Sequence, residues 1–461
     1  MFEIKPNTTD GRSTGRKYEA TQNACKLCTP LGACLAFKGI NNAITLLHGS
    51  QGCSTYIRRY TISHFREPVD IASSNFSEDT AVYGGEANLL TAIKNVIYQY
   101  NPDVIGIPTT CLSETIGDDV KMIVRSIKDK LENEEGIHLI PVSTPSYSGT
   151  HADGFQLAAK GAVERFAEEP MGKQNNLVNI FHSMQSPADI RLLKEIIADF
   201  GLEGTVFPDY SDTMDGGVWK EYERIPKGGT TINEMKIMSS AAASIEFGYV
   251  APEKSAASYL EEKFEVKKYP VSIPIGIINS DAFFKVLEEI SGRKTPDKYL
   301  SERRRLIDSY VDAHKYLFGK KVLIYGEEDL VLALAQFVSE IGLVPEICAT
   351  GSVNKSFKEK IQAYLPNSEQ VTVLDDSDFE IIREAILEKE IDLIIGNSKG
   401  YKIAREVKIP LVRVGFPIHD RIGAQRLKIC GFEGTQELFD RVTNALLEYK
   451  QENSPIGYSY I

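Results

Sequence analysis

The feature that most constrains the fold is the regular alternation of short apolar segments with longer amphipathic ones. The stretch "DVIGIPTTC" (103–111) illustrates the first kind, because apolar residues run without interruption and polar residues close the run. Such a run is typical of a strand that is buried on both faces of a parallel sheet. Repeated strand–helix units predict an α/β protein, in which parallel sheets carry helices on both faces.

The length of 461 residues is too great for one ordinary core and suggests about three domains. Pro and Gly punctuation at "EEPMGKQNN" (168–176) ends a first series of units, and a clean β–turn–α–β unit fills residues 319–351. We therefore expect three Rossmann-like domains, each a parallel sheet flanked by helices. The expected boundaries are a loose N-terminal arm at 1–20 and domains at 21–172, 173–318 and 319–461, the last with a C-terminal helix.

The same patterns place individual elements. Further strands are expected at 138–143, 177–183, 204–210, 272–277, 370–376, 392–400 and 410–416. Helices are expected from about Asp118 and at 153–168, 187–200, 378–389 and 434–450. Residues 211–235 are rich in Gly, Thr and Asp and read as a long loop.

Charge and the N-terminus exclude several classes of function. The formal net charge of −12 argues against a nucleic-acid or anionic-membrane partner, because the overall field would repel both. The first residues contain no apolar signal-peptide segment, and no apolar run approaches the ~18 residues of a membrane span. We expect a cytoplasmic protein. Seven cysteines are too few for a disulfide scaffold in a chain of this length.

Three of these cysteines stand at expected element boundaries. Cys28 lies in "LCTPLG", Cys53 in "GSQGCS" and Cys111 in "TTCLSE". Cys53 and Cys111 each follow an apolar run, and ligands of parallel sheets bind at the carboxyl ends of strands. Turn N–H groups can bond to bridging sulfides, so three such thiols favour an iron–sulfur site. A cubane cluster usually takes four thiolates, which leaves water, a serine or a cysteine of another chain as the remaining ligand.

Other interpretations of the cysteines and loops are weaker. The pair Cys25 and Cys28 resembles half of a zinc site or a redox dithiol, but no second CxxC accompanies it. Cys34 and Cys348 fit the ordinary fate of a free cysteine, which is to be a small buried apolar residue, and Cys430 has no evident partner. The sequence contains no GxxxxGK[ST], HExxH or GxSxG motif, so a P-loop ATPase and two common hydrolase types are excluded.

Six short blocks, taken together, resemble the nitrogenase component 1 β-type family and keep its order and rough spacing. They are "CTPLGA" (28–33), "HGSQGC" (48–53), "HFREP" (64–68), "TTCLSETIGDD" (109–119), "TPSYSG" (144–149) and "RVGFPIHDR" (413–421). The resemblance covers the chain from about residue 21 to its end. It implies three Rossmann-like domains, an α2β2 heterotetramer with an α-type partner, and a metal cluster at the αβ interface.

The resemblance also assigns ligands. The three cysteines that bind the P-cluster in the catalytic β subunits match Cys28, Cys53 and Cys111, and a nearby serine matches Ser146. Some scaffold subunits of the NifN type keep only the cysteine matching Cys53, and their NifE partner gives three thiolates to a [4Fe–4S] cluster. This chain keeps all three cysteines. Two alternatives remain: a larger, P-cluster-like cluster, or a [4Fe–4S] cluster to which Cys28 and Cys111 do not bind.

Within the family, "ATQNACKLCTPLGA" (20–33) and the tail at 422–461 look most like the NifN subunits of anaerobes. This implies a scaffold, formed with a NifE-like subunit, on which the iron–molybdenum cofactor is matured. The partner would hold the cofactor precursor, and the nitrogenase Fe protein would bind transiently to supply electrons and ATP hydrolysis. The alternative is a catalytic, NifK-like β subunit with half of a P-cluster. A purely structural α/β protein with inert thiols would require the six blocks to be accidental.

Overall fold

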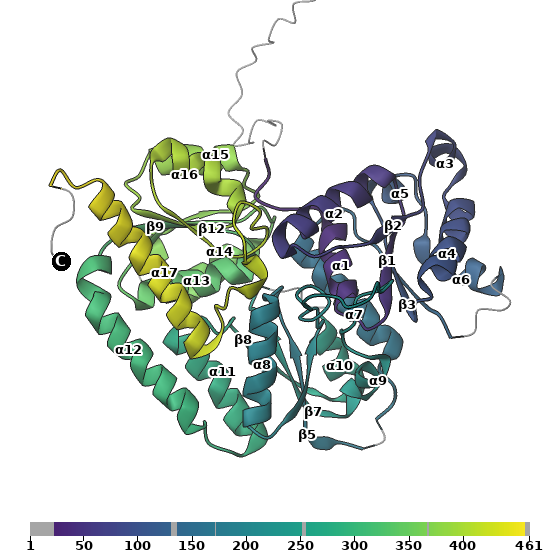
Figure 1. Cartoon of the computed structure of the whole chain (residues 1–461), viewed down its shortest axis with the longest axis horizontal. Coiled ribbons are helices and arrows are strands. Elements are labelled where there is room, and N and C mark those ends of the chain that lie inside the picture. Colours follow the sequence, from purple (N-terminus) through teal and green to yellow (C-terminus); the bar gives the residue numbers. More distant parts are fainter. Residues whose placement is uncertain (1–22, 131–135, 171, 251–254, 367, 457–461) are drawn as a thin grey trace, which may run out of the picture.

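The computed structural model describes residues 23–130, 136–170, 172–250, 255–366 and 368–456, so the expected arm at 1–20 lies outside the described residues. Three separate sheets form the frame, and every pairing between their named strands is parallel (Figure 1). The α/β architecture predicted from the sequence is therefore confirmed. The exact domain boundaries stay predictions.

The first sheet has the strand order β2-β1-β3-β4, the second β6-β5-β7-β8 and the third β11-β10-β9-β12-β13. The strands of the first sheet are β1 (Ala43–Leu47), β2 (Ile71–Ser73), β3 (Val104–Pro108) and β4 (His138–Val142). Those of the second are β5 (Gln174–Phe181), β6 (Glu203–Phe207), β7 (Ala241–Phe247) and β8 (Lys267–Val271). Those of the third are β9 (Lys321–Tyr325), β10 (Val344–Ala349), β11 (Thr372–Leu374), β12 (Leu393–Gly396) and β13 (Leu411–Arg413).

Helices cover the sheets. The N-terminal part contains α1 (Thr29–Lys38), α2 (Gln51–Phe65), α3 (Glu78–Tyr83), α4 (Glu86–Tyr100), α5 (Cys111–Thr115), α6 (Val120–Lys130) and α7 (His151–Phe166). The middle part contains α8 (Pro187–Asp199), α9 (Ile232–Ile237), α10 (Ala256–Phe264), α11 (Gly276–Ser291) and α12 (Asp297–Leu317). The C-terminal part contains α13 (Glu328–Glu340), α14 (Lys355–Tyr364), α15 (Phe379–Leu387), α16 (Tyr401–Val407) and α17 (Gly431–Glu452).

The expected strand at 272–277 is wrong. The strand is β8, which ends at Val271, and the following residues form a buried connection into α11. Ile273 and Ile275 are buried although they belong to no strand. The backbone N–H of Gly276 donates to the hydroxyl of Thr435 on α17, so tertiary contacts satisfy this connection instead of a sheet ladder. In the sequence, a short buried apolar run looks the same whether it forms a strand or a buried connection.

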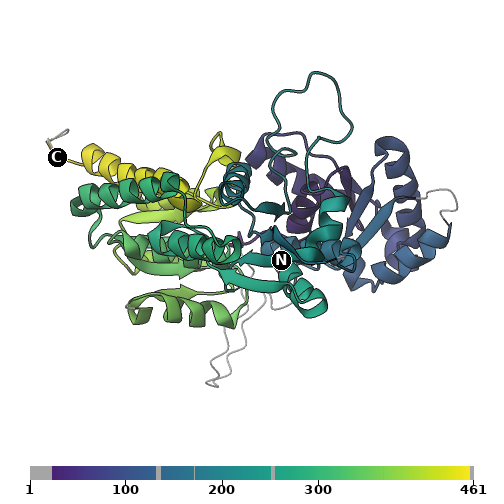
Figure 2. The same ribbon diagram turned by 90° about the horizontal axis from the view of Figure 1, so that it is seen from below.

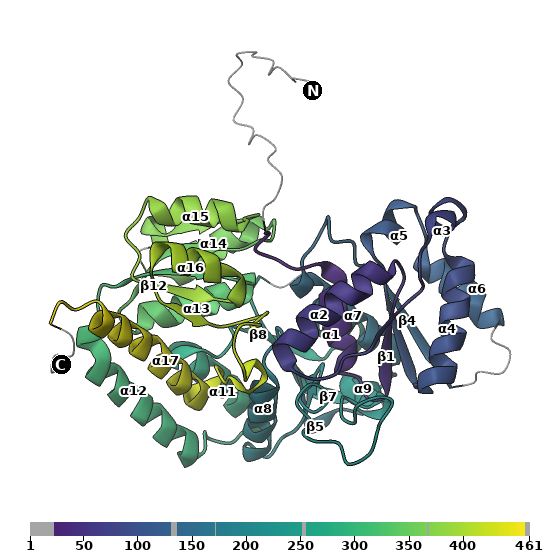
Figure 3. The same cartoon turned by 45° about the horizontal axis from the view of Figure 1, so that its top comes forward.

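The long loop expected at 211–235 is shorter than predicted. A capping box of Thr231 and Glu234 starts α9, so the irregular connection from β6 ends at residue 231. Figure 2 shows this connection standing out from the body of the molecule. The 21-residue helix α12 was not assigned from the sequence; it lies beside α17 along one side of the molecule (Figure 3). Within the described residues, no helix combines the length and apolarity needed to cross a membrane.

One large apolar core joins the three parts of the chain, and hydrogen bonds fix their relative position. His151 at the start of α7 bonds through Nε2 to the carboxylate of Glu327, at 2.6 Å. His64 near the end of α2 accepts the backbone N–H of Ile418 through Nδ1, at 2.8 Å. Burial lowers the pKa of His64 to about 3, so the ring is neutral and its Nδ1 is available as an acceptor at neutral pH. The first sheet is therefore held against the third.

Candidate metal centre

Three predicted ligands meet at one edge of the first sheet. The strands β1, β3 and β4 are neighbours, and because they are parallel their carboxyl ends lie side by side. Cys53 follows β1 in the first turn of α2, Cys111 follows β3 as the first residue of α5, and Ser146 lies in the loop after β4. Strand order and the parallel direction thus bring together residues that are far apart in the sequence.

Cys28 reaches the same edge from a helix that precedes the sheet. It is the N-cap of α1, and a turn of four residues connects α1 to the start of β1. A helix joined to a strand by so short a turn runs antiparallel to it, so the start of α1 lies at the carboxyl edge. Pro30, within the first two helical positions, fits this start because its fixed φ favours the first turn.

Hydrogen bonds connect three of these positions, and the fourth, Cys53, has a hydrogen bond within its own turn. The backbone N–H of Thr29 donates to Ser146 Oγ at 3.1 Å, which ties the residue after Cys28 to the loop after β4. The backbone N–H of Ser146 donates to Cys111 Sγ at 3.3 Å. Ser50 Oγ donates to Cys53 Sγ at 3.6 Å. The N–H and O–H groups that surround the sulfurs are those that stabilise a thiolate.

The turn after β1 is fixed by a close approach to the turn after β3. A Cβ on Gly49 would lie 2.1 Å from Thr110 Oγ1, so this position requires glycine. His48, which is fully buried, fills the space behind the turn: its Nε2 lies 3.1 Å from Asp118 Oδ2 and its Nδ1 lies 3.2 Å from Ser74 Oγ. The turn at Gly49 therefore sets the position of Cys53 relative to Cys111.

A second close approach positions Cys28. Helices α1 and α7 cross so closely that a Cβ on Gly154 would lie 1.8 Å from the backbone oxygen of Thr29. At the reciprocal glycine, Gly32, an added Cβ would lie 1.7 Å from the backbone oxygen of His151. Sequence reasoning missed both positions. A glycine inside a helical pattern is the signal that could have found them, because it often marks a packing constraint.

The electrostatics of the site follow from its burial. Burial raises the pKa of Cys28 to about 12, and the neighbouring thiols of Cys53 and Cys111 add to the rise because each disfavours a second negative charge. Cys28 and Cys53 are half-buried, whereas Cys111 is exposed. A cationic metal centre would reverse this preference, so metal binding at Cys28 would release a proton.

The donor set fits a cluster and not a single ion. Among the residues that the structure describes, no three His, Cys, Asp or Glu side chains converge closely enough to hold one metal ion. In an iron–sulfur cluster each thiolate binds a different iron, so the sulfurs of the protein stand further apart than around one ion. An iron–sulfur cluster suits the three thiols and one hydroxyl at this edge of the sheet, where one of the thiols is exposed.

The remaining cysteines lie in cores. Cys34 and Cys348 are buried, as the sequence predicted, and Cys430 is buried as well. Cys25 belongs to the core on one face of the third sheet, and its backbone N–H donates to the Ser377 oxygen. Cys28 lies instead at the edge of the first sheet. The zinc and dithiol interpretations of the pair therefore receive no support from the packing.

Comparisons with known proteins show what the whole chain is similar to. Residues 28–447 match the family model described as nitrogenase component 1 type oxidoreductase. The chain is 37% identical to the nitrogenase molybdenum–iron protein beta chain of Clostridium pasteurianum, covering 92% of this chain and 93% of that one. It is 34% identical to the vanadium–iron protein beta chain of Trichormus variabilis, covering 92% and 94%. A solved structure titled nitrogenase Cp1 at pH 6.5 superimposes with a TM-score of 0.93 at 35% identity, covering 97% of this chain and 98% of that one.

Proposed function

The chain belongs to the nitrogenase component 1 family, in its β-type branch, and from this premise we propose that it is the NifN-type subunit of a cofactor-assembly scaffold. In the proposal it pairs with a NifE-like α-type subunit in an α2β2 heterotetramer and holds an iron–sulfur cluster at the αβ interface. The observation that carries the interfacial cluster is the meeting of Cys28, Cys53, Cys111 and Ser146 at one edge of the first sheet. The scaffold role rests on the resemblance of two segments to NifN subunits.

The surface around the thiols supports an interface. Tyr56, Leu112 and Tyr147 each lie within three residues of a proposed ligand, and these residues are 42%, 39% and 68% exposed. Exposed apolar groups beside an exposed thiol mark a surface that another chain covers. An α-type subunit seated here would shield the cluster and supply its missing thiolates.

The residues of this chain take defined roles in the proposal. The thiolate of Cys53 would bind iron in either form of the cluster, and the thiolates of Cys28 and Cys111 with the hydroxyl of Ser146 would complete the donor set of a P-cluster-like form. Such a cluster, when bound, would relay electrons from the Fe protein, which binds transiently. This sequence has no P-loop motif, so ATP hydrolysis is assigned to the Fe protein. The precursor of the iron–molybdenum cofactor is held mainly by the partner. A [4Fe–4S] cluster on Cys53 and a P-cluster-like group on all three thiolates are both compatible with the donor set.

Two observations bear on the scaffold role. The N-terminal segment at 20–33 and the tail at 422–461 resemble NifN subunits. The relatives compared above are named as catalytic beta chains, of a molybdenum–iron protein at 37% identity and of a vanadium–iron protein at 34%. These names favour a second candidate, a catalytic NifK-like β subunit that carries half of a P-cluster.

Expression with and without the α-type partner tests the interfacial site. We expect the chain alone to aggregate or to hold little iron, because half of a site leaves thiols and apolar groups exposed. Co-expression should give a soluble complex with a stoichiometric cluster. Iron analysis and analytical ultracentrifugation of both preparations provide the measurement. A well-behaved monomer with a full complement of iron would contradict an interfacial site.

A further inference from the structure

Two buried histidines lie beside the segments that carry the proposed cluster ligands. His48 precedes the turn at Gly49 that leads to Cys53. His151 begins α7, which crosses α1 beside Cys28. In each ring, one nitrogen is bonded to a carboxylate and the other to a partner that leads toward the ligand. Each ring therefore stands between a fixed acceptor and a predicted ligand.

The first carboxylate, Asp118, joins the segment of Cys111 to the turn of Cys53. Asp118 follows α5, the helix that Cys111 begins, and its backbone N–H donates to the oxygen of Ser113 in that helix at 3.1 Å. This bond ties Asp118 to the segment of Cys111. Its Oδ2 lies 3.1 Å from Nε2 of His48, so one side chain connects the two ligand-bearing segments.

The other nitrogen of His48 reaches the turn through one hydroxyl group. Ser74 Oγ lies 3.2 Å from His48 Nδ1, and the same oxygen accepts the backbone N–H of Gly49 at 3.0 Å. Burial lowers the pKa of His48 below its usual range, although the carboxylate of Asp118 acts in the opposite direction, so the ring is neutral. An ionised carboxylate offers only acceptors, so Nε2 carries the ring hydrogen and Nδ1 accepts the Ser74 hydroxyl. A continuous chain of bonds thus leads from Asp118 to the backbone of Gly49.

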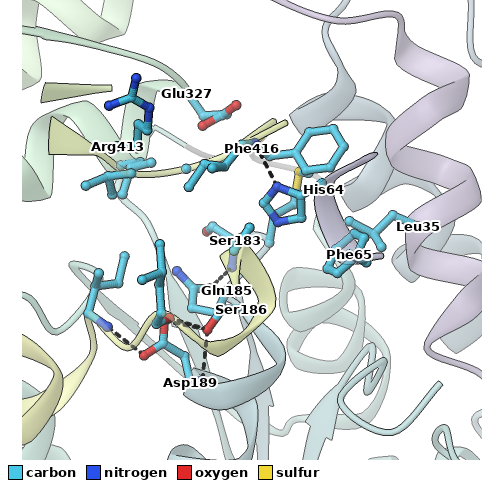
Figure 4. A pocket seen from close by; sticks show the side chains of 18 of the residues that line it. Leu35, His64, Phe65, Ser183, Gln185, Ser186, Asp189, Glu327, Arg413 and Phe416 are labelled. Atoms are coloured by element: carbon cyan, nitrogen blue, oxygen red, sulfur yellow. Dashed lines mark hydrogen bonds between the residues drawn. The ribbon is translucent and has the colours of Figure 1, made fainter. Parts of the chain in front are cut away.

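The second carboxylate, Glu327, acts on the residue before Cys28. His151 Nδ1 accepts the backbone N–H of Leu27 at 3.3 Å, and the backbone N–H of His151 donates to the Leu27 oxygen at 3.1 Å. Since Nδ1 is an acceptor, Nε2 carries the ring hydrogen and donates it to Glu327 at 2.6 Å. Glu327 precedes α13 and lines the cavity where the three parts of the chain meet (Figure 4). A carboxylate from the third part of the chain therefore fixes the peptide next to Cys28.

We propose that Asp118 and Glu327 are positioning residues of the metal centre, and that each acts through a histidine. Asp118 sets the position of Cys53 relative to Cys111, and Glu327 sets the position of Cys28. Outer partners of this kind orient the ligands of a metal site, and a buried polar network in which every bond is made is rigid. The inference rests on the interfacial cluster of the proposed function, and it applies to a scaffold and to a catalytic subunit alike.

Alanine and amide variants of the two carboxylates test the proposal in the purified complex with the α-type partner. Asp118→Ala and Glu327→Ala each leave a buried ring N–H without its acceptor, so the ligand-bearing segment should loosen. We expect a ferrous chelator to extract the cluster iron roughly tenfold faster, the usual scale for losing an outer partner of a metal ligand. The shape of the electron paramagnetic resonance signal should change as well. Asp118→Asn and Glu327→Gln retain an oxygen that accepts the ring N–H, so they should recover slow iron release.

Asp119→Ala is the matched control. Asp119 is the exposed neighbour of Asp118, and its carboxylate accepts the backbone N–H groups of Lys121 and Met122 at the start of α6. Its removal takes away the same charge and weakens a helix start, so the midpoint temperature of thermal unfolding should fall. The rate of iron release and the shape of the signal should not change, which separates positioning from general stability.

A second variant of each chain breaks it at a different bond. Ser74→Ala removes the hydroxyl between the first ring and the turn, and His151→Phe keeps the second ring but loses both of its bonds. Each should reproduce the effect of the corresponding alanine variant, and each decides the result if that variant does not assemble.

Two results would overturn the role of either carboxylate. One is wild-type iron release and an unchanged signal in its alanine variant. The other is an amide variant that behaves as the alanine variant does, which would show that the charge matters and the bond to the ring does not. A wild-type complex without cluster iron would instead overturn the interfacial cluster itself, so failure of the positioning role and failure of the proposed function are distinguishable.

Discussion

Replacing Cys53 with alanine is expected to remove the interfacial iron–sulfur cluster. Cys53 is the thiol that follows the fixed turn at Gly49, and it is the ligand that the [4Fe–4S] and the P-cluster-like forms share. Alanine leaves one iron without its protein donor, and no other cysteine of the described residues lies in the first turn of α2 to replace it. The iron content and the electron paramagnetic resonance signal of the purified complex, compared with those of the wild type, measure the loss.

The matched control is Cys34→Ala. Cys34 is buried on α1, only six residues from Cys28, but it belongs to the apolar core. Its replacement should leave the cluster signal unchanged and cost roughly 1–2 kcal/mol of stability through lost packing. An unchanged cluster signal in Cys53→Ala would remove Cys53 from the set of ligands. It would also contradict the claim that the turn at Gly49 positions a ligand.

Gly154→Ala is expected to have the largest effect on the fold. The new Cβ would lie 1.8 Å from the backbone oxygen of Thr29, and backbone atoms cannot move aside as the end of a flexible side chain can. The start of α1 must shift, which disturbs Cys28 and the hydrogen bond from Thr29 to Ser146. We expect a loss of about 3 kcal/mol or more in the free energy of unfolding, at the upper end of overpacking effects. The midpoint temperature of thermal unfolding and the iron content of the complex should both fall.

Gly161→Ala in the same helix is the control. A Cβ there would meet only the methyl groups of Val142 and Ile140, at 3.3 and 3.6 Å. It should leave the cluster intact and change stability little, since alanine gains up to ~1 kcal/mol in helix propensity to offset the tight contact. Equal behaviour of the two variants would show that the crossing of α1 and α7 does not position Cys28.

The elements that the sequence predicted well are those whose pattern is local. The run at 103–111 has the continuous apolar character of a central strand, and the structure places β3 there between β1 and β4. β8 was missed because it is an edge strand with polar, partly exposed residues, "KKYPV", while the buried connection beside it imitated a strand. Burial depends on tertiary packing, which a single short segment does not encode.

The candidate site also combines features that a local sequence pattern predicts with features that depend on tertiary packing. Cys28, Cys53 and Cys111 could be selected from their positions at element boundaries, and the structure places them together with Ser146. The hydrogen bond from Thr29 to Ser146 and the close approach of Gly154 to Thr29 could not be predicted, because each joins residues more than a hundred positions apart.

The measurement that tests the scaffold role most directly is cofactor transfer. A scaffold must bind its product weakly enough for a tighter-binding acceptor to remove it, whereas a catalyst must retain its cofactor through turnover. The purified heterotetramer is loaded with the iron–sulfur precursor and incubated with Fe protein, ATP, reductant, molybdate and homocitrate. It is then mixed with cofactor-free component 1. We predict that the recipient becomes active while the heterotetramer alone reduces dinitrogen negligibly. Sustained dinitrogen reduction by the heterotetramer itself, without activation of the recipient, would contradict the scaffold role and identify the chain as a catalytic β subunit.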